Sequence, residues 1–521
     1  MNKSPPSQHV EDINIEADGG DIHVTKSKVN VSGTVQLTAG TIVYIPTPTS
    51  DPQVSTVGLC LVSGFGGLLT FYIPDYVADG KTYADITSLM TYPTMTMGIG
   101  NLIGMPMAIA VGRRIVLLAA TAIMLVGAIL CAFATNFDWH LGARMLVGFA
   151  AGQSEALVPM ITQEIFFLHE RGTFLMLQQS IQSITTAVLV LFASPIAEAI
   201  TPQWWYGLGA CLSGLALVMA FVFVPETKYH RPRSSLQENM SSNGLDNVSD
   251  EHVAKDAHRV VTERPALDFV TYQARTWRSD LRLWIGSPEW RKGVDTFIQA
   301  FQLLLFPNVL WAMALNGLTL GVNIAIGTTY GTIITTLYGW PERSTSYVNC
   351  GQIVTSLVAL PFFGLGSDKL IAWFAKRRNG IHEPEIRLLP LVLPIIIGTF
   401  TSVLYGYGAA NPSSYHWFVY VWAVGGYYFT FVGANIVAIT YLLDSYPQRA
   451  SSLLIIICAF RGIISFGVSY GISPFIDRSG YYGAFSTFGG LTAALGLLGI
   501  PVFIWGKKIR EFTGRFAVDK E

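Results

Sequence analysis

Two ionisable residues lie in one long apolar stretch, residues 141–172. At about 100° per residue, Arg144 and Glu155 fall on the same face of a helix as Gly148 and Gly152, within roughly 80° of one another. A charged side chain in hydrocarbon is costly unless it faces protein or water, so both are candidates for function. A carboxylate in such a site can bind and release a proton. The alternative is that both charges only fix the packing of neighbouring helices.

Each of these two charges needs another partner. They are separated by about 16 Å along the helix, at 1.5 Å per residue, which is too far for a direct pair. Arg461, in the middle of a later apolar segment, is a candidate partner for one of them. We predict that Glu155, Arg144 and Arg461 couple function to proton movement, with Glu155 as the carrier. A permanently paired Glu155 is the alternative.

The composition is that of an integral membrane protein. Of 521 residues, 51% are hydrophobic and 13% are charged, about half the charged fraction of a soluble domain. The net charge of −1 argues against a nucleic-acid partner. The five cysteines lie inside apolar segments without metal-type spacing, so we predict no metal site and no disulfide framework.

Twelve apolar segments are long enough to cross a bilayer, because about 20 residues span its core. They are residues 54–76, 89–111, 115–135, 139–167, 174–199, 204–224, 307–337, 347–366, 388–407, 415–442, 451–475 and 483–505. The predicted fold is an all-α membrane protein of twelve transmembrane helices in two six-helix bundles. The predicted parts are a disordered cytoplasmic tail (1–53), the two bundles (54–224 and 307–506), a cytoplasmic central loop (225–306) and a second tail (507–521). Two similar halves around a central site are a recurrent plan of secondary transporters.

The distribution of Lys and Arg orients the chain. With the N-terminus inside, fourteen of them fall on the short inner loops and the C-terminal tail, and three fall on the outer loops. In the central loop, residues 274–306 alternate apolar and charged residues. This pattern predicts an amphipathic helix, either on the inner membrane surface or as a soluble docking helix.

Polar side chains inside the apolar segments are candidates for substrate binding. We predict this role for Asn316, Asn323, Gln352, Asn435 and Tyr428. Amides orient polar groups, and aromatic rings stack on aromatic or cationic compounds. The alternative is that the amides only form hydrogen bonds between helices and that the ring only packs against its neighbours. The glycine pairs Gly100/Gly104, Gly317/Gly321 and Gly467/Gly471 predict close helix crossings.

Residues at the predicted inner helix ends, all but one of them charged, are candidates for gating. They are Gly112, Arg113, Arg114, Glu170, Arg171, Asp368 and Lys369. Charge pairs there form when the inner side closes and break when it opens. The alternative is that these residues only anchor the topology. Because the sequence contains neither a phosphate-binding loop nor the motifs of hydrolases or metalloproteases, we predict no cofactor, no ATP dependence and no enzymatic activity.

Several short motifs resemble those of the major facilitator superfamily, and within it the fungal twelve-span transporters of the drug:proton antiporter branch, especially the polyamine- and cation-transporter-like group. They are Thr-Tyr-Pro at 91–93, Gly-Ile-Gly-Asn-Leu-Ile at 98–103, Gly-Arg-Arg at 112–114, Ser-Glu at 154–155, Phe-Phe-Leu-His-Glu-Arg-Gly at 166–172, Val-Pro-Glu-Thr-Lys-Tyr at 224–229, Ser-Asp at 367–368, Lys-Arg-Arg-Asn-Gly at 376–380, Glu-Pro-Glu at 383–385 and Asp-Ser-Tyr-Pro at 444–447. The chain departs from the family pattern at Met105 and Ile109, which replace a Gly and an Asp of the inner loop motif. It also keeps only Ser194 and Pro195 of the antiporter motif in the fifth span.

This resemblance implies a proton-coupled transporter that works by alternating access. We expect a monomer in the plasma membrane, or alternatively the vacuolar membrane, that exports a small amphipathic or cationic organic compound. Proton-driven uptake of a polar nutrient or polyamine is the second interpretation. A membrane sensor that binds ligand without transporting it is a third, of a different class.

Overall fold

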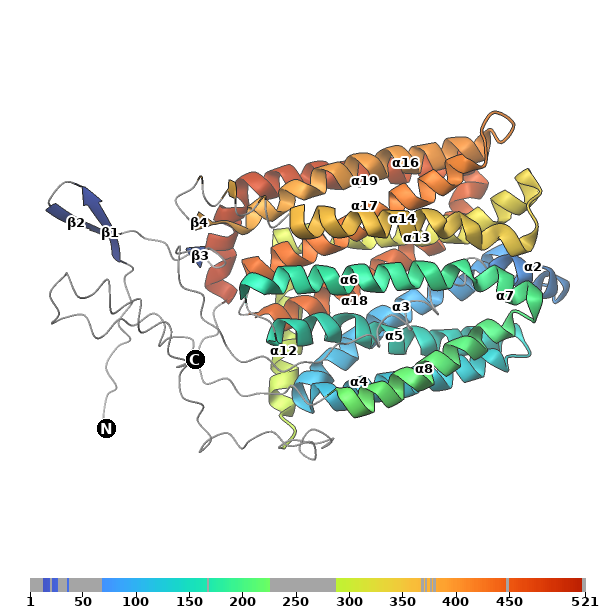
Figure 1. The fold of residues 1–521 in the computed structure, drawn as a ribbon, viewed down its shortest axis with the longest axis horizontal. Helices are drawn as coiled ribbons and strands as arrows, with labels where there is room; N and C mark the ends of the chain where they lie inside the picture. The colour runs from blue at the N-terminus through green and yellow to red at the C-terminus, as the bar shows by residue number, and fades with distance from the viewer. Residues whose placement is uncertain are drawn as a thin grey trace.

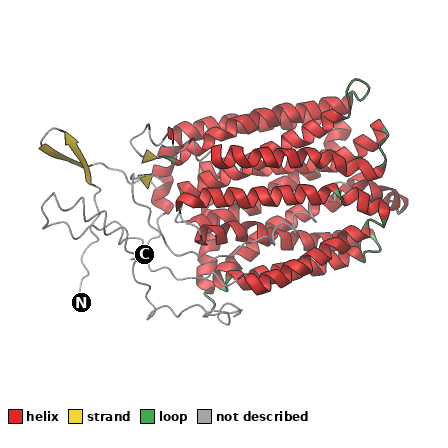
Figure 2. Cartoon of the chain, viewed as in Figure 1, coloured by secondary structure: helices red, strands yellow, loops and turns green. Residues whose placement is uncertain are grey.

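A computed structural model describes most of the chain: residues 13–18, 21–26, 35–36, 68–165, 168–224, 287–366, 370, 373–374, 377, 381–446 and 449–517. Helices dominate these residues (Figure 2). The predicted first span therefore lies partly outside the described residues, at 54–67, as do residues 225–286 of the predicted central loop.

The N-terminal half consists of the helices before the central loop. They are α2 (Leu69–Ala78), α3 (Tyr83–Ala110), α4 (Arg113–Ala132), α5 (Phe137–Ile165), α6 (Leu168–Leu191), α7 (Ala193–Ala199) and α8 (Gln203–Phe223). Helix α3 packs along α5, and α4 packs on both α5 and α8. The predicted fifth span is thus two helices, α6 and α7, which meet at Phe192.

The C-terminal half follows helix α12 (Trp290–Gln302) and the short turn η2 (Leu303–Leu305). It contains α13 (Pro307–Tyr338), η3 (Glu342–Asn349), α14 (Cys350–Ala359), the π-helical turn η4 (Leu360–Gly366), η5 (Pro384–Leu391), α16 (Val392–Ala410), α17 (Phe418–Ser445), α18 (Ala450–Tyr470) and α19 (Ile472–Ala517). Helix α13 packs on α18 and α17, and α16 packs on α17 and α19. Figure 1 shows the two halves as neighbouring bundles whose helices run in broadly the same direction.

Local sequence explains several helix ends. Thr82 and Asp85 form a capping box before α3, in which each side chain accepts a hydrogen bond from the backbone N–H of the other residue. Hydrogen bonds from Thr82 hold the pKa of Asp85 below its usual range. Helix α13 begins with Pro307 and ends at Tyr338, and Gly339 caps it with a φ of 67° that suits glycine.

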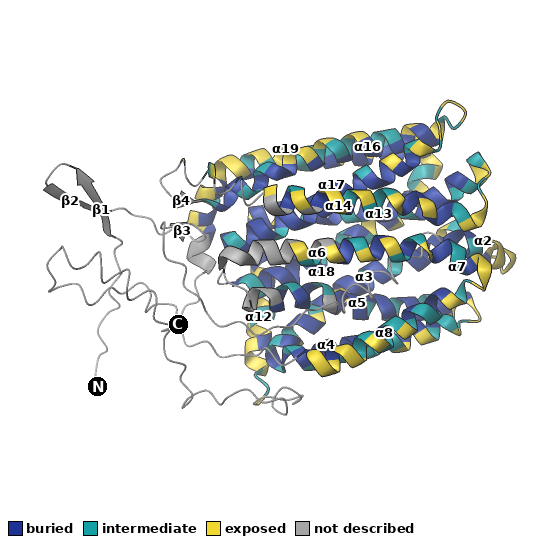
Figure 3. Ribbon diagram, viewed as in Figure 1, coloured by how far each residue is buried: buried dark blue, intermediate teal, exposed yellow. Residues whose placement is uncertain are grey.

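Nine of the described segments are long and apolar enough to cross a membrane by length and composition. Helices α3 and α5 contain more polar residues, but their 28 and 29 residues reach about 42 Å at 1.5 Å per residue, beyond the roughly 30 Å hydrocarbon core. Large apolar side chains such as Leu215 and Ile396 are exposed on the outside of the bundle, and burial is concentrated inside it (Figure 3). This distribution is expected of helices surrounded by lipid. The helical fold that the sequence predicts for the membrane-spanning part is confirmed.

The connection between the last two spans differs from the prediction. We expected an outer loop after residue 475, but helical structure resumes at Ile472 and continues to Ala517. Gly480 interrupts it with a φ of 66°, a left-handed conformation that glycine adopts without strain. The chain therefore turns within a helical segment.

The described residues include four short strands outside the helical bundle (Figure 2). Strand β1 (Ile13–Asp18) pairs with β2 (Asp21–Lys26) in an antiparallel hairpin, and β3 (Val35–Gln36) pairs with β4 (Ile381–His382). Three of these strands fall within residues 1–53, for which the sequence predicted a disordered tail. Regular pairing is present at those positions.

Ion pairs hold the predicted inner end of the C-terminal half. Arg510 donates two hydrogen bonds of 2.8 Å to the carboxylate of Glu385, and both side chains are buried. Arg387 pairs with Asp444. Glu385 and Asp444 belong to two of the motifs quoted above, and the structure gives both motifs a packing role.

Candidate functional site

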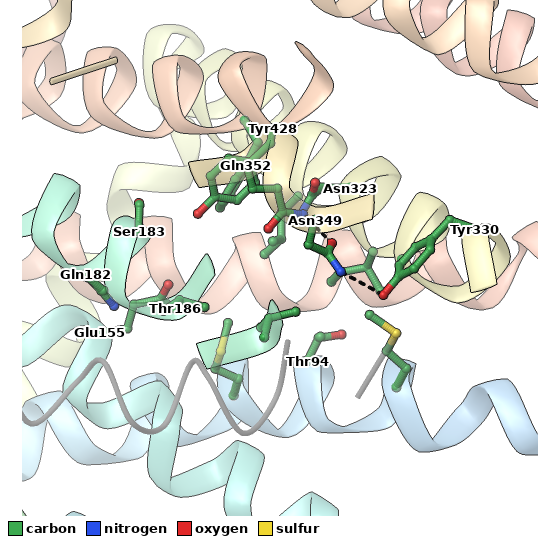
Figure 4. Close-up of a pocket in the computed structure, with 17 residues that line it drawn as sticks. Thr94, Glu155, Gln182, Ser183, Thr186, Asn323, Tyr330, Asn349, Gln352 and Tyr428 are labelled. Carbon is green, nitrogen blue, oxygen red and sulfur yellow. Dashed lines mark hydrogen bonds between the residues drawn. The ribbon is translucent and has the colours of Figure 1, made fainter. Parts of the chain in front are cut away.

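A cavity lies between the two halves (Figure 4). Its walls come from α3, α5 and α6 on one side and from α13, η3, α14 and α17 on the other. The lining residues are Met90, Thr94, Met97, Glu155, Gln182, Ser183, Thr186, Val190, Leu320, Asn323, Ile324, Gly327, Tyr330, Asn349, Gln352, Tyr428 and Phe431. They surround about 950 Å³ of empty space, with solvent at the opening included. Pockets of this size hold small organic molecules.

Amides and hydroxyls are the commonest polar groups of this lining. Asn349 donates to the Tyr330 hydroxyl at 3.0 Å, and Gln352 donates to the Asn349 side-chain oxygen at 3.2 Å. Figure 4 shows the first of these bonds facing the cavity. The Gln182 side-chain nitrogen and the Thr186 hydroxyl are buried without a hydrogen-bond partner among the described residues. Both groups are available to a bound molecule.

Glu155 and Arg461 form an ion pair across the boundary between the halves. Glu155 belongs to α5 and lines the cavity, and Arg461 belongs to α18 and is 1% exposed. The other carboxylate oxygen, Oε2 of Glu155, is buried without a hydrogen-bond partner in the part of the chain that the structure describes. The pair is therefore next to the cavity and incompletely satisfied.

Two buried amides support Arg461 from behind. Its Nη1 donates to Oδ1 of Asn435 at 2.7 Å, and Nδ2 of Asn316 donates to the same oxygen at 3.1 Å. Both amides are buried. This chain of contacts fixes the guanidinium in front of Glu155.

Glycines allow α5 to bring Glu155 to this position. A Cβ atom on Gly152 would lie 2.0 Å from the Met97 carbonyl oxygen, and one on Gly148 would lie 2.3 Å from that of Pro93. Helices α3 and α5 are therefore in backbone contact, as small residues permit. The predicted crossings at Gly100/Gly104 and Gly317/Gly321 are also in close contact with neighbouring helices. The prediction for Gly467 is wrong, because a Cβ there would meet no described atom within 4 Å.

Arg144 lies in a different network, nearer the predicted outer end of α5. Its Nε donates to the Leu89 carbonyl oxygen at 2.6 Å and its Nη1 donates to the Tyr206 hydroxyl at 2.9 Å. The same hydroxyl is 2.8 Å from Nε2 of His140, whose Nδ1 is 2.9 Å from the Tyr76 hydroxyl. All of these residues are buried and belong to the N-terminal half.

The halves also touch at the predicted outer end. The Ser194 hydroxyl of α7 lies 2.8 Å from that of Thr345 and 2.6 Å from that of Ser346, both in η3. The backbone N–H of Ser194 donates to Ser346 at 3.0 Å. Ser194, one of the two residues kept from the antiporter motif, thus forms a contact between the halves.

Comparison with known proteins identifies the family. The profile of the Major Facilitator Superfamily matches residues 54–457, more than half of the chain. The chain belongs to this superfamily. It is therefore a multi-pass membrane transporter, as the sequence predicted, and not an enzyme.

Individual relatives agree with this assignment. An uncharacterised transporter of the superfamily from Schizosaccharomyces pombe is 23% identical, over 91% of this chain and 89% of that protein. The efflux pump dotC of Dothistroma septosporum is 28% identical over 25% of this chain and 22% of its own. In fold, the chain is similar to the Escherichia coli xylose transporter XylE in a partially occluded inward-open conformation, with a TM-score of 0.54 and 16% identity over 87% of this chain and 96% of that one.

The structure divides the predicted binding residues of the transporter into two groups. Asn323, Gln352 and Tyr428 line the cavity. Asn316 and Asn435 are instead buried behind Arg461 and are absent from the lining. Gln182, Thr186 and Asn349 also line the cavity and were not predicted from the sequence. The spacing of Gln182 and Thr186, four positions apart in an apolar segment, was a signal that both share one face of a helix.

The structure describes the side chains of only some of the predicted gating residues. Arg114 is buried, and its Nη2 donates to the Phe221 carbonyl oxygen at 2.6 Å, so it joins α4 to α8 within the N-terminal half. Gly112 turns the chain between α3 and α4 with a φ of 143°, next to Arg113. Asp368 and Lys369 lie outside the described residues, as do the side chains of Glu170 and Arg171. Their gating role stays a prediction.

Proposed function

We propose that this transporter is a proton-coupled secondary active transporter that exports a small amphipathic or cationic organic compound across the plasma membrane. The observation that carries the proposal is the ion pair between Glu155 and Arg461 at the wall of the cavity. Arg461 keeps its charge at all physiological pH values. Protonation of Glu155 is therefore the event that can break the pair.

The pair supports a link between protonation and conformation. With Glu155 ionised, α5 and α18 attract each other across the boundary of the halves. Once a proton neutralises Glu155, that attraction is lost, while Asn435 still holds Arg461. A cycle of pairing and release at this position would alternate the exposure of the cavity, which is the movement that two-bundle transporters use.

The cavity lining supports the chemistry of the compound. The unpartnered Oε2 of Glu155 can accept a hydrogen bond from an ammonium group, which would then compete with Arg461 and with the proton. Met90, Met97 and Phe431 offer adaptable apolar contacts to the rest of such a molecule. The name of the relative dotC supports the outward direction.

Uptake of a polar nutrient or polyamine with protons is the second candidate. It is favoured by the number of amide and hydroxyl groups among the lining residues, since these groups could surround a molecule with little apolar surface.

The test uses purified protein in sealed vesicles that contain a pH-sensitive dye. A panel of polyamines, lipophilic cations such as tetraphenylphosphonium, and amphipathic drugs is added outside without an initial pH gradient. Protons moving opposite to the compound would support antiport and export. Protons moving with it would overturn export in favour of uptake. Binding without movement of compound or proton would overturn transport and leave the sensor interpretation.

Two variants make the test specific. We expect E155Q still to bind and exchange the compound. We expect it no longer to move protons when the compound crosses the membrane. E198Q is the matched control, because Glu198 is an exposed carboxylate of α7 and is absent from the lining. Unchanged proton coupling in E155Q would contradict the role of Glu155 as carrier.

A further inference from the structure

Three polar groups among the residues that line the cavity are buried without a hydrogen-bond partner in the described part of the chain. They are Nε2 of Gln182, the hydroxyl of Thr186 and Oε2 of Glu155. Gln182 is 4% exposed and Thr186 is 8% exposed. Figure 4 shows the three residues on the same side of the cavity, away from Tyr330. Because a buried polar group without a partner is costly, these groups indicate what a bound molecule has to supply.

Helix α6 places two of these groups on one face. Gln182 and Thr186 are four positions apart, Val190 follows four positions later, and all three residues line the cavity. From Gln182 to Val190 the helix rises about 12 Å, at 1.5 Å per residue. This wall of the cavity is therefore polar at one end and apolar at the other.

Polar side chains elsewhere in the lining are bonded within the protein. Asn349 donates to the Tyr330 hydroxyl, and Gln352 donates to Asn349. On α3, the Thr94 hydroxyl donates to the carbonyl oxygen of residue 91 at 2.6 Å, within its own helix. A bound molecule would have to replace these hydrogen bonds. At Gln182 and Thr186 it would instead add hydrogen bonds that the described residues do not make.

The chemistry of the three groups defines their partners. Nε2 of a glutamine only donates, and a threonine hydroxyl both donates and accepts. An uncharged oxygen acceptor, such as a carbonyl oxygen, can accept from both Gln182 and Thr186. The carboxylate oxygen of ionised Glu155 only accepts, and a protonated amine gives it a charge-assisted hydrogen bond. One molecule that carries an amine and a carbonyl oxygen can therefore satisfy all three groups.

The charges of the lining limit how many amines the molecule carries. Among the described lining residues, Glu155 is the only Asp, Glu, Lys or Arg. A compound with several ammonium groups would leave all but one of them without a carboxylate in the cavity, which is costly for a charge removed from water. The side chains of Met90, Leu320 and Ile324 instead provide apolar surface for the rest of the molecule.

We propose that the cavity selects organic monoamines that also carry a neutral oxygen acceptor, with the ammonium group at Glu155 and the acceptor at Gln182 and Thr186. Gln182 and Thr186 then determine which amines are preferred. This inference rests on the proposed function, because it takes Glu155 as the group that receives a cation. It adds a second point of recognition to that site.

Three compounds of equal length separate the two points of recognition. N-(2-aminoethyl)benzamide carries an amine and a carbonyl oxygen, 4-phenylbutylamine carries only the amine, and N-propylbenzamide carries only the amide. Their binding to the purified full-length protein is measured by isothermal titration calorimetry at neutral pH. We expect N-(2-aminoethyl)benzamide to bind about tenfold more tightly than 4-phenylbutylamine, because it gains one or two hydrogen bonds. Equal affinity for these two amines would overturn the inference.

Variants assign this preference to the two residues of α6. Q182L/T186V lacks both polar groups, so we expect the ratio of the two affinities to fall to about one while 4-phenylbutylamine still binds. T185V is the matched control, because Thr185 is exposed on the same helix and is absent from the lining. If Q182L/T186V binds neither amine, T186V gives the comparison, with a ratio reduced about threefold. An unchanged ratio would overturn the role of the two residues.

The same measurements distinguish failure of this inference from failure of the proposed function. If N-propylbenzamide binds as tightly as N-(2-aminoethyl)benzamide, the cationic class of the proposed compound is wrong, and the inference fails with it. If the two amines bind equally tightly and N-propylbenzamide binds weakly, only the inference fails. Calorimetry detects binding alone, so an absence of proton movement in vesicles would leave the preference standing.

Discussion

Glu155 of α5 and Arg461 of α18 are joined by an ion pair across the boundary between the two halves of the transporter. The Arg461 side chain is 1% exposed and that of Glu155 is 12% exposed, and Asn435 orients the guanidinium. Such a pair has two consequences that can be measured separately, one for stability and one for the response to protons.

We expect R461Q to destabilise the protein more than the double variant E155Q/R461Q does. Removing Arg461 alone leaves the largely enclosed Glu155 carboxylate without this counter-charge, a change that costs roughly 3–5 kcal/mol in fully buried pairs. Neutralising both partners removes that penalty. Thermal unfolding of the purified protein, followed by tryptophan fluorescence, gives the comparison. A double variant no more stable than R461Q would show that the pair is unimportant for folding.

The two groups of amides should differ in what they affect. N323A changes the cavity lining, so we expect a higher half-saturation concentration for the transported compound and an unchanged pH profile. N435A removes the oxygen that accepts from Arg461 at 2.7 Å, so we expect a shifted pH profile and a lower melting temperature. Both variants are measured in the same vesicles at several pH values. The reverse pattern would contradict the division between the groups.

The difference between the two groups of amides shows which features could not be predicted from the sequence. The order and length of the spans follow from the sequence because a helix in lipid must be long and apolar. Glu155 and Arg461 are conspicuous in such helices for the same reason. The direction in which Asn316 or Asn323 points is different, because lipid and the protein interior are both apolar and the sequence gives little rotational signal. Only the packing of α13 against α17 and α18 decides which amide faces the cavity.

Most contacts between neighbouring elements could not be predicted from the sequence either. The sequence places Gly148 and Gly152 of α5 on one face of the helix, and in the structure that face contacts α3. It gave no means to predict that Ser194 meets Thr345 and Ser346, because these residues are about 150 positions apart and their hydroxyls suit many other partners.

Gly152 and Gly142 of α5 provide a matched pair of substitutions. We expect G152A to destabilise the protein by at least about 1–3 kcal/mol, because its Cβ would lie 2.0 Å from the Met97 carbonyl oxygen and would push α3 away. G142A has open space around its Cβ and should raise stability by about 0.5–1 kcal/mol through helix propensity. Thermal unfolding measures both. Equal effects would contradict backbone contact between α3 and α5.

The outer contact between the halves should affect access from outside. S194A removes a hydroxyl that bridges α7 to η3, at a cost of about 1 kcal/mol, which corresponds to about fivefold in an opening equilibrium. We expect about fivefold faster labelling of a T186C reporter by an impermeant thiol reagent added outside. S213A is the control, since the Ser213 hydroxyl donates within α8, to the Gly209 carbonyl oxygen at 2.7 Å. Equal labelling in the two variants would exclude a role of Ser194 in closure.

For Arg144, a structural role can be distinguished from a role in proton coupling. The sequence predicted that it takes part in proton coupling, but its guanidinium bridges the Leu89 carbonyl oxygen and the Tyr206 hydroxyl within the N-terminal half. A lysine carries its donors on one nitrogen and cannot reproduce a forked contact of this kind. We therefore expect R144K to lower stability by about 1–3 kcal/mol and to leave the pH profile of the remaining transport unchanged.

Removal of the Tyr206 hydroxyl tests the same interpretation of Arg144. Y206F keeps the ring and removes the oxygen that lies 2.9 Å from Arg144 and 2.8 Å from His140. If Arg144 is an anchor, Y206F and R144K should destabilise the protein in the same way, and combining them should cost less than the sum of the two, because both remove one shared contact. Should R144K instead shift the pH profile as N435A is expected to, Arg144 would act in coupling from a distance, through the movement of α5 that carries Glu155.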